Sequence, residues 1–62
     1  MTFAEQLKSE RKRTGLTQAQ AAAILHTPPR TYWEYEAGKA EPLIPYQHGA
    51  LAIMASTPPK PG

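Results

Sequence analysis

Cysteine is absent from this 62-residue chain, and its absence removes two common ways of stabilising a small fold. The chain can form no disulfide and no thiolate zinc site, and the isolated His26 and His48 are too few for a structural metal site. A chain this short buries a smaller share of its surface than larger domains do. We therefore expect self-association to supply stability, and we expect no metal and no other cofactor.

Long apolar runs and catalytic groupings are also missing. No segment is long enough to cross a membrane or to act as a signal peptide, and a cysteine-free composition fits a reducing cytosol. The hydroxyls of Ser9, Ser56 and the threonines lack a base with its orienting group, and no glycine-rich phosphate loop is present. These absences predict a soluble cytoplasmic protein that is not an enzyme, has no small-molecule substrate and does not contact membranes.

The chain has only a small excess of positive over negative charge. Seven Lys and Arg stand against five acidic residues, which gives a formal net charge of +2. Four basic residues crowd the first quarter of the chain, namely Lys8, Arg11, Lys12 and Arg13. This balance permits a polyanionic partner without requiring one.

The first predicted helix begins with a capping box. Thr2 and Glu5 have the spacing at which each side chain bonds the backbone N–H of the other residue. The pattern predicts a helix over residues 3–14 that ends at Gly15, which adopts the left-handed conformation without steric cost. Arg11 lies in the middle of the otherwise apolar face of this helix, and it therefore needs a partner.

The second predicted helix begins in the same way. Thr17 and Gln20 repeat the capping-box spacing, and the alanine-rich segment that follows has high helix propensity. We expect a helix of about two turns over residues 18–25, followed by a turn at His26 and Thr27.

The third predicted helix starts at a pair of prolines. Pro29 forces Pro28 into an extended conformation, which suits an N-cap, while Pro29 itself suits the first helical position, where no N–H is needed. The helix should cover residues 29–37, with Gly38 after its end and Pro42 beyond as a stop.

A fourth helix is predicted from Pro45 to about Ser56, and residues 57–62 should form a disordered tail. This helix has more apolar residues than the core of one small domain can bury, so we expect two copies of the chain to form a homodimer through it. The expected dimerisation residues are Tyr46, Ala50, Leu51, Ile53 and Met54. The fold class is therefore all-α, a compact bundle of about four helices in one domain over residues 1–56.

Two short helices joined by a tight turn have the geometry that places a helix in the major groove of DNA. The residues that carry a closer resemblance are Gly15-Leu16-Thr17-Gln18, Ala21-Ala22, Leu25, Arg30-Thr31-Tyr32, Tyr35-Glu36-Ala37-Gly38 and Pro42. Over residues 3–55 the chain resembles the Cro/C1 type of helix-turn-helix repressor. It is most similar to very short phage-borne members, including regulators associated with anti-CRISPR operons. The resemblance implies a homodimeric repressor that binds an inverted repeat in double-stranded DNA.

The resemblance also implies roles for individual residues. Pro29, Arg30, Trp33 and Glu34 match the positions that face the DNA bases. Arg30 is suited to a guanine, and Glu34 to the amino group of a cytosine.

Residues outside the base-contacting face also match positions of known role. Gln18, at the start of its helix, and Lys39, just after the third helix, match positions that contact phosphates. Arg11 and Glu36 match a buried ion pair that ties the first helix to the third, which accounts for the arginine on an apolar face.

The sequence departs from the family at several positions. His26 stands where a turn glycine is usual, and Pro28 replaces a serine cap. The large Trp33 could pack against a sugar, a thymine methyl group or a partner subunit. We expect no counterpart of the family's fifth helix in this sequence, so the dimer surface should differ from that of longer members.

Simpler interpretations stay open for some of these residues. Arg30 and Glu34 are four apart on one helix and could merely pair with each other. Lys8, Lys12 and Arg13 are expected to form the solvated face of the first helix. The main alternative for the whole chain is a protein-interaction module, such as an antitoxin or adaptor with the same fold.

Overall fold

The computed structural model describes residues 2–59, and this part of the chain contains four α-helices and no strand. The helices are α1 (Phe3–Thr14), α2 (Gln18–Ile24), α3 (Pro29–Ala37) and α4 (Ile44–Ser56). The predicted all-α bundle is therefore confirmed. The predicted ends of two helices are wrong by one residue, because Leu25 is the C-cap of α2 and Leu43 is the N-cap of α4.

Local capping explains where α1 and α2 begin. The backbone N–H of Glu5 donates to Thr2 Oγ1 at 3.2 Å, and Thr2 N donates back to Glu5 Oε1 at 3.1 Å. Thr17 and Gln20 make the same reciprocal pair at 3.1 and 3.0 Å. Each box satisfies backbone donors that a helix start otherwise leaves unpaired.

The turn between α2 and α3 is tight although it contains no glycine. His26 adopts a left-handed conformation with φ of 53°. The N–H of His26 donates to Ala23 O at 3.1 Å, and the N–H of Thr27 donates to Ala22 O at 2.9 Å. Histidine enters this region more readily than most residues do, so the substitution for glycine is tolerated.

The start of α3 follows the predicted order of the two prolines. Pro28 is the N-cap, with φ of −57° and ψ of 139°, and it makes no side-chain cap bond. Pro29 is the first helical residue, and Gly38 ends the helix in the left-handed conformation with φ of 75°. The direction in which α3 leaves the turn is thus set by the restricted backbone of two prolines.

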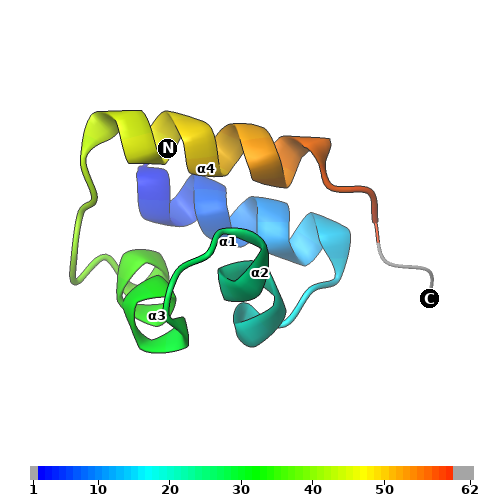
Figure 1. Cartoon of the computed structure of the whole chain (residues 1–62), viewed down its shortest axis with the longest axis horizontal. Coiled ribbons are helices and arrows are strands. Elements are labelled where there is room, and N and C mark those ends of the chain that lie inside the picture. Colours follow the sequence, from blue (N-terminus) through cyan, green and yellow to red (C-terminus); the bar gives the residue numbers. More distant parts are fainter. Residues whose placement is uncertain (1, 60–62) are drawn as a thin grey trace.

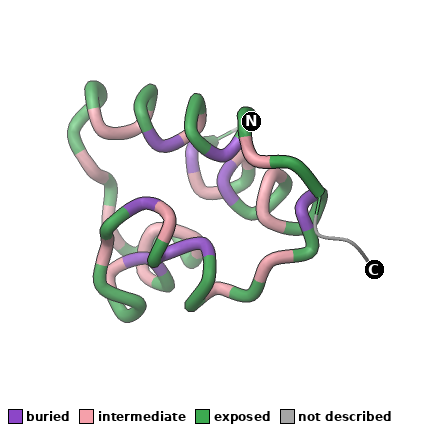
Figure 2. Tube along the Cα trace, turned by 45° about the vertical axis from the view of Figure 1, so that its right-hand side comes forward, coloured by how far each residue is buried: buried purple, intermediate pink, exposed green. Residues whose placement is uncertain are grey.

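The four helices enclose one small core. In Figure 1, α1 and α4 lie side by side and run in the same direction, while the short α2 and α3 lie below them. Figure 2 shows the buried positions turned towards the interior of the bundle. The core consists of Phe3, Leu7, Ala21, Ala22, Leu25, Tyr32, Ala50 and Met54. Because α1 packs against both α3 and α4, it is the central support of the fold.

Arg13 fastens the far ends of α1 and α4. Its Nη2 donates to the carbonyl oxygens of Met54 at 3.0 Å and Thr57 at 3.2 Å, and its Nε donates to Glu10 at 3.0 Å. Arg13 is exposed, as expected of the solvated face of α1, and its contact with the end of α4 is an addition that the sequence did not predict. Carbonyl oxygens at the C-terminal end of a helix carry partial negative charge and have room for a second donor, which is the physical reason for this contact.

The predicted tail over residues 57–62 is only partly described. The N–H of Thr57 donates to Met54 O at 3.1 Å, so the first residue after α4 is hydrogen-bonded to the helix. Residues 60–62 lie outside the described residues.

Along the described chain, no helix is both long and apolar enough to span a bilayer. Nor does any group of three His, Cys, Asp or Glu side chains within residues 2–59 come together to hold a metal ion.

Candidate nucleic-acid interface

The structure brings Arg11 and Glu36 together as an ion pair. Arg11 Nε donates to Glu36 Oε2 at 2.7 Å, and Nη2 donates to Oε1 at 3.2 Å. Arg11 Nη1 also donates to Leu16 O at 3.2 Å. The two side chains are 17% and 4% exposed. A two-bond pair of this kind fixes direction as well as distance, so it locks α3 against α1 and the following turn.

The surroundings of the pair keep both groups charged. Burial alone would raise the pKa of Glu36, but hydrogen bonds from Arg11 and Gln18, together with the nearby hydroxyl of Tyr32, outweigh burial and lower it below its ordinary value. The pKa of Arg11 is raised, chiefly by its hydrogen bonds to Glu36. The pair is thus ionised throughout the neutral range.

Tyr32 lies in the core beside this pair. Its side chain is fully buried, and burial followed by the nearby Glu36 carboxylate raises the pKa of its hydroxyl. Among the described residues, the hydroxyl reaches no partner with full hydrogen-bond geometry, although Glu36 is close enough to affect its titration. Tyr32 therefore sits on the inner side of α3 as a neutral phenol.

Gln18 is linked to the same pair. Its Nε2 donates to Glu36 Oε1 at 3.3 Å, which uses one of the two N–H groups of the amide. The first residue of α2 is thereby tied to the end of α3. The sequence suggested a phosphate contact for Gln18, and the structure adds this internal bond, which orients the amide.

Aromatic contacts hold the inner side of α3 against the other helices. The ring of Tyr35 meets Phe3 edge-on, with centroids 6.4 Å apart, and lies 5.5 Å from the ring of Tyr46. Tyr46 also shares a hydrogen bond with Thr27 in the turn before α3. With one side of α3 held in this way, the other side must face outward.

The outward side of α3 carries the predicted base-contacting residues. Pro29, Arg30 and Trp33 are exposed, and Glu34 is half-buried. Within residues 2–59, Arg30 and Glu34 form no ion pair with each other or with another side chain. The simple intrahelical pair is therefore not formed, and the guanidinium group of Arg30 stays available to a partner.

Trp33 and Lys39 are in contact, which the sequence analysis missed. Lys39 Nζ lies 4.8 Å from the centroid of the Trp33 ring. Trp33 also borders a hollow of about 280 Å³ whose lining includes Lys8 and Gln18. Gly38 precedes Lys39 in the sequence, and its left-handed conformation turns the chain back towards Trp33. This glycine is the sequence signal that could have revealed the contact.

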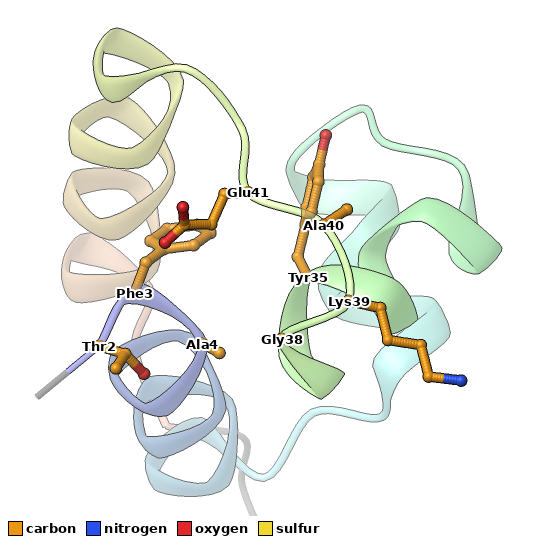
Figure 3. Close-up of a pocket in the computed structure, with 8 residues that line it drawn as sticks. All are labelled: Thr2, Phe3, Ala4, Tyr35, Gly38, Lys39, Ala40 and Glu41. Atoms are coloured by element: carbon orange, nitrogen blue, oxygen red, sulfur yellow. The ribbon is translucent and has the colours of Figure 1, made fainter.

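A second hollow, of about 360 Å³, lies where the start of α1 meets the end of α3. It is lined by Thr2, Phe3, Ala4, Tyr35, Gly38, Lys39, Ala40 and Glu41. Figure 3 shows that the Lys39 side chain extends away from the other labelled side chains. The ammonium group of Lys39 therefore belongs to the surface around Trp33 and not to this hollow.

The expected dimerisation residues divide between core and surface. Ala50 and Met54 are buried within the single chain, while Tyr46 and Leu51 are half-buried. Ile53 is 46% exposed. The side chains of Ala50 and Met54 face the core of their own chain, so of these five residues Ile53 offers the most surface to a partner.

One comparison with known proteins identifies a family. A family model described as a helix-turn-helix domain matches residues 2–56, a span that includes all four helices. No curated protein and no solved structure matches the chain. Since the model covers most of the sequence, this chain belongs to the helix-turn-helix domain family.

Proposed function

We propose that this protein is a sequence-specific transcriptional regulator that places α3 in the major groove of double-stranded DNA. The observation that carries the proposal is the outward face of α3, where Pro29, Arg30 and Trp33 are exposed. A rigid helix that exposes an arginine in its first turn is suited to groove binding. Family membership supports DNA as the partner.

Two kinds of contact are proposed for this surface. Arg30 lies in the first turn of α3, where side chains reach base edges, and its fork of donors matches the O6 and N7 atoms of guanine. Glu34, one turn later, would accept a hydrogen bond from a cytosine amino group. Gln18 and Lys39 lie at helix ends on either side, where they would contact phosphates and fix the register.

A second copy of the chain is the proposed partner of α4. This helix contains no Lys, Arg, Asp or Glu, yet much of it faces solvent. Its exposed residues are Ile44, Pro45, His48, Gly49, Ala52, Ile53, Ala55 and Ser56. A helix that is apolar on all sides is normally covered by another element. Figure 2 shows the outer side of α4 exposed along the helix.

Small residues at the middle of this outer side favour a close helix crossing. A Cβ atom added at Gly49 would meet no atom within 4 Å, so glycine is not required there by the packing of its own chain. Gly49 and Ala52 would let the α4 helices of two copies approach closely, with Ile53 packed beside the crossing. The resulting two-fold symmetry matches an inverted-repeat operator.

Repression is the proposed outcome of binding, on the strength of the likeness to Cro/C1-type repressors. A dimer bound next to a promoter would exclude other proteins from the same DNA. Arg30, which makes no ion pair within residues 2–59, favours an anionic partner over a protein-interaction module, since only Pro29 and Trp33 add apolar surface beside it.

A footprint on the DNA upstream of the protein's own gene tests the proposal. We expect protection of two half-sites with inverted sequence, centred about one helical turn or a multiple of it apart. Failure to prefer any segment of this DNA over random duplex would contradict sequence-specific regulation at this site.

A further inference from the structure

Trp33 occupies an unusual place for a large aromatic residue. It is the only tryptophan in the chain, it lies on the outward face of α3, and it is 44% exposed. Such a residue could contact a base, contact a partner subunit or organise a neighbouring group. Three features of its surroundings separate these roles.

The first feature is the fixed backbone of Lys39. The N–H of Lys39 donates to Glu34 O at 2.9 Å, and the N–H of Gly38 donates to Tyr35 O at 3.3 Å. Together with the left-handed Gly38, these two bonds form a Schellman motif. The motif turns the chain back at the end of α3, so the Cα of Lys39 has a defined position relative to the helix.

The second feature is the direction of the Lys39 side chain. Its Nζ lies 4.8 Å from the centre of the Trp33 ring, within the range of a cation–π contact. No carboxylate within residues 2–59 pairs with this ammonium group. The ring is therefore its one observed partner in the described part of the chain, and the charge stays available to an anion.

The third feature is the hollow that Trp33 borders. The ring borders the hollow of about 280 Å³ that Lys8 and Gln18 also line. Arg11 and Glu36 line it too, but they neutralise each other. Lys8 and Lys39 thus leave the surroundings of Trp33 with a positive excess. Trp33 thus contacts Lys39 and shares a hollow with Gln18, the two residues for which phosphate contacts are proposed.

We propose that Trp33 is a positioning residue that holds the ammonium group of Lys39 in place for a DNA phosphate. This inference rests on the proposed function, because it needs a DNA backbone next to α3. A free lysine side chain loses rotamer freedom when it binds a phosphate. Contact with the ring removes part of that freedom before DNA arrives, which strengthens binding without any base contact by Trp33.

A double-mutant cycle on the full chain tests the inference. The dissociation constant for the operator is measured for the natural protein, Trp33→Ala, Lys39→Ala and the double variant. We expect Trp33→Ala to weaken binding by about two- to fivefold, equally for all single-base variants of the operator. In the Lys39→Ala background, removal of Trp33 should have no further effect. Trp33→Phe should restore part of the affinity, since a phenyl ring also attracts a cation.

Three results would overturn the inference. The effects of Trp33→Ala and Lys39→Ala could be additive, the effect of Trp33→Ala could be confined to one base pair, or the dimer could dissociate in sedimentation. The first result would mean independent residues, the second a base contact and the third a subunit contact. A natural protein that binds no DNA would instead refute the proposed function.

Fluorescence tests the contact without DNA, because Trp33 is the only emitting indole. Lys39→Met should change the emission of Trp33, whereas Lys12→Met should not, since Lys12 is exposed and does not line the hollow. Thermal melts of the same variants check that each still folds. Identical emission spectra for Lys39→Met and the natural protein would overturn the proposed contact.

Discussion

Arg11 of α1 and Glu36 of α3 are joined by two hydrogen bonds, with Nε and Oε2 2.7 Å apart, in a site where the carboxylate is almost fully buried. The pair connects two helices through residues that are 25 positions apart in sequence. Because α3 is held from behind by this pair and by Tyr35, the orientation of its outer face depends on contacts far from any DNA.

Removal of either member should strongly destabilise the fold. Arg11→Ala or Glu36→Ala leaves a buried, uncompensated charge, which costs about 3–5 kcal/mol. Chemical unfolding at low temperature measures the difference in stability. Glu10→Ala is the matched control, because Glu10 belongs to an exposed pair with Arg13 and should cost less than about 1 kcal/mol. Equal stabilities for Glu36→Ala and Glu10→Ala would refute the structural role of the buried pair.

Acid should unfold the protein partly through Glu36. Its folded pKa lies below the ordinary value of 4.5, because hydrogen bonds from Arg11 and other donors outweigh the opposite effect of burial. A lowered pKa contributes stability above the unfolded value, and this stability is lost as the pH falls from about 4.5 through the folded pKa. The free energy of unfolding measured between pH 7 and pH 3 should therefore decline less in Glu36→Gln. Parallel curves for the two proteins would contradict this.

Arg13 should stabilise the packing of α4 on α1. Arg13→Ala removes two bonds to the carbonyls of Met54 and Thr57 and should cost about 1–2 kcal/mol, near the lower end for charged donors because the site is partly exposed. Lys12→Ala removes an exposed neighbour of similar size and should be nearly neutral. Equal melting temperatures for Arg13→Ala and Lys12→Ala would show that the contact with α4 contributes nothing to stability.

Dimerisation should depend on the outer side of α4. Ala52→Glu places a charge on this exposed side and should convert the proposed dimer to a monomer in sedimentation at micromolar concentration. Ala23→Glu makes the same change at an exposed position of α2 and should leave the dimer intact. If the natural chain sediments as a monomer and binds one half-site as tightly as the full repeat, the dimer is wrong.

The starts of α1, α2 and α3 could be predicted because their causes are local. Thr2 with Glu5, Thr17 with Gln20, and Pro28 with Pro29 each act within a few residues, and all three act in the structure as expected. The internal partner of Arg11 could also be inferred, since a charge on an inward face demands one.

The inward side of α4 could not be predicted in the same way. The apolar residues of α4 lie on all its sides, and no charged side chain identifies the outer one. Periodicity therefore did not separate the buried Met54 from the exposed Ile53. The contact of Lys39 with Trp33 and the bonds from Arg13 to α4 were missed for a different reason. Both depend on the path of the chain in three dimensions, and side-chain type alone does not encode it.

The proposed function requires Arg30 to contact a base edge and Lys39 to contact the DNA backbone. The most direct test measures the affinity of Arg30→Ala and Lys39→Ala for single-base operator variants over a range of salt concentrations. Arg30→Ala should cost about 1–3 kcal/mol per half-site and abolish the preference at one base pair. Lys39→Ala should weaken binding to all sequences alike and reduce the salt slope by about one unit for each phosphate that is no longer bound. A uniform fall in affinity for Arg30→Ala, with every base preference retained, would contradict the account.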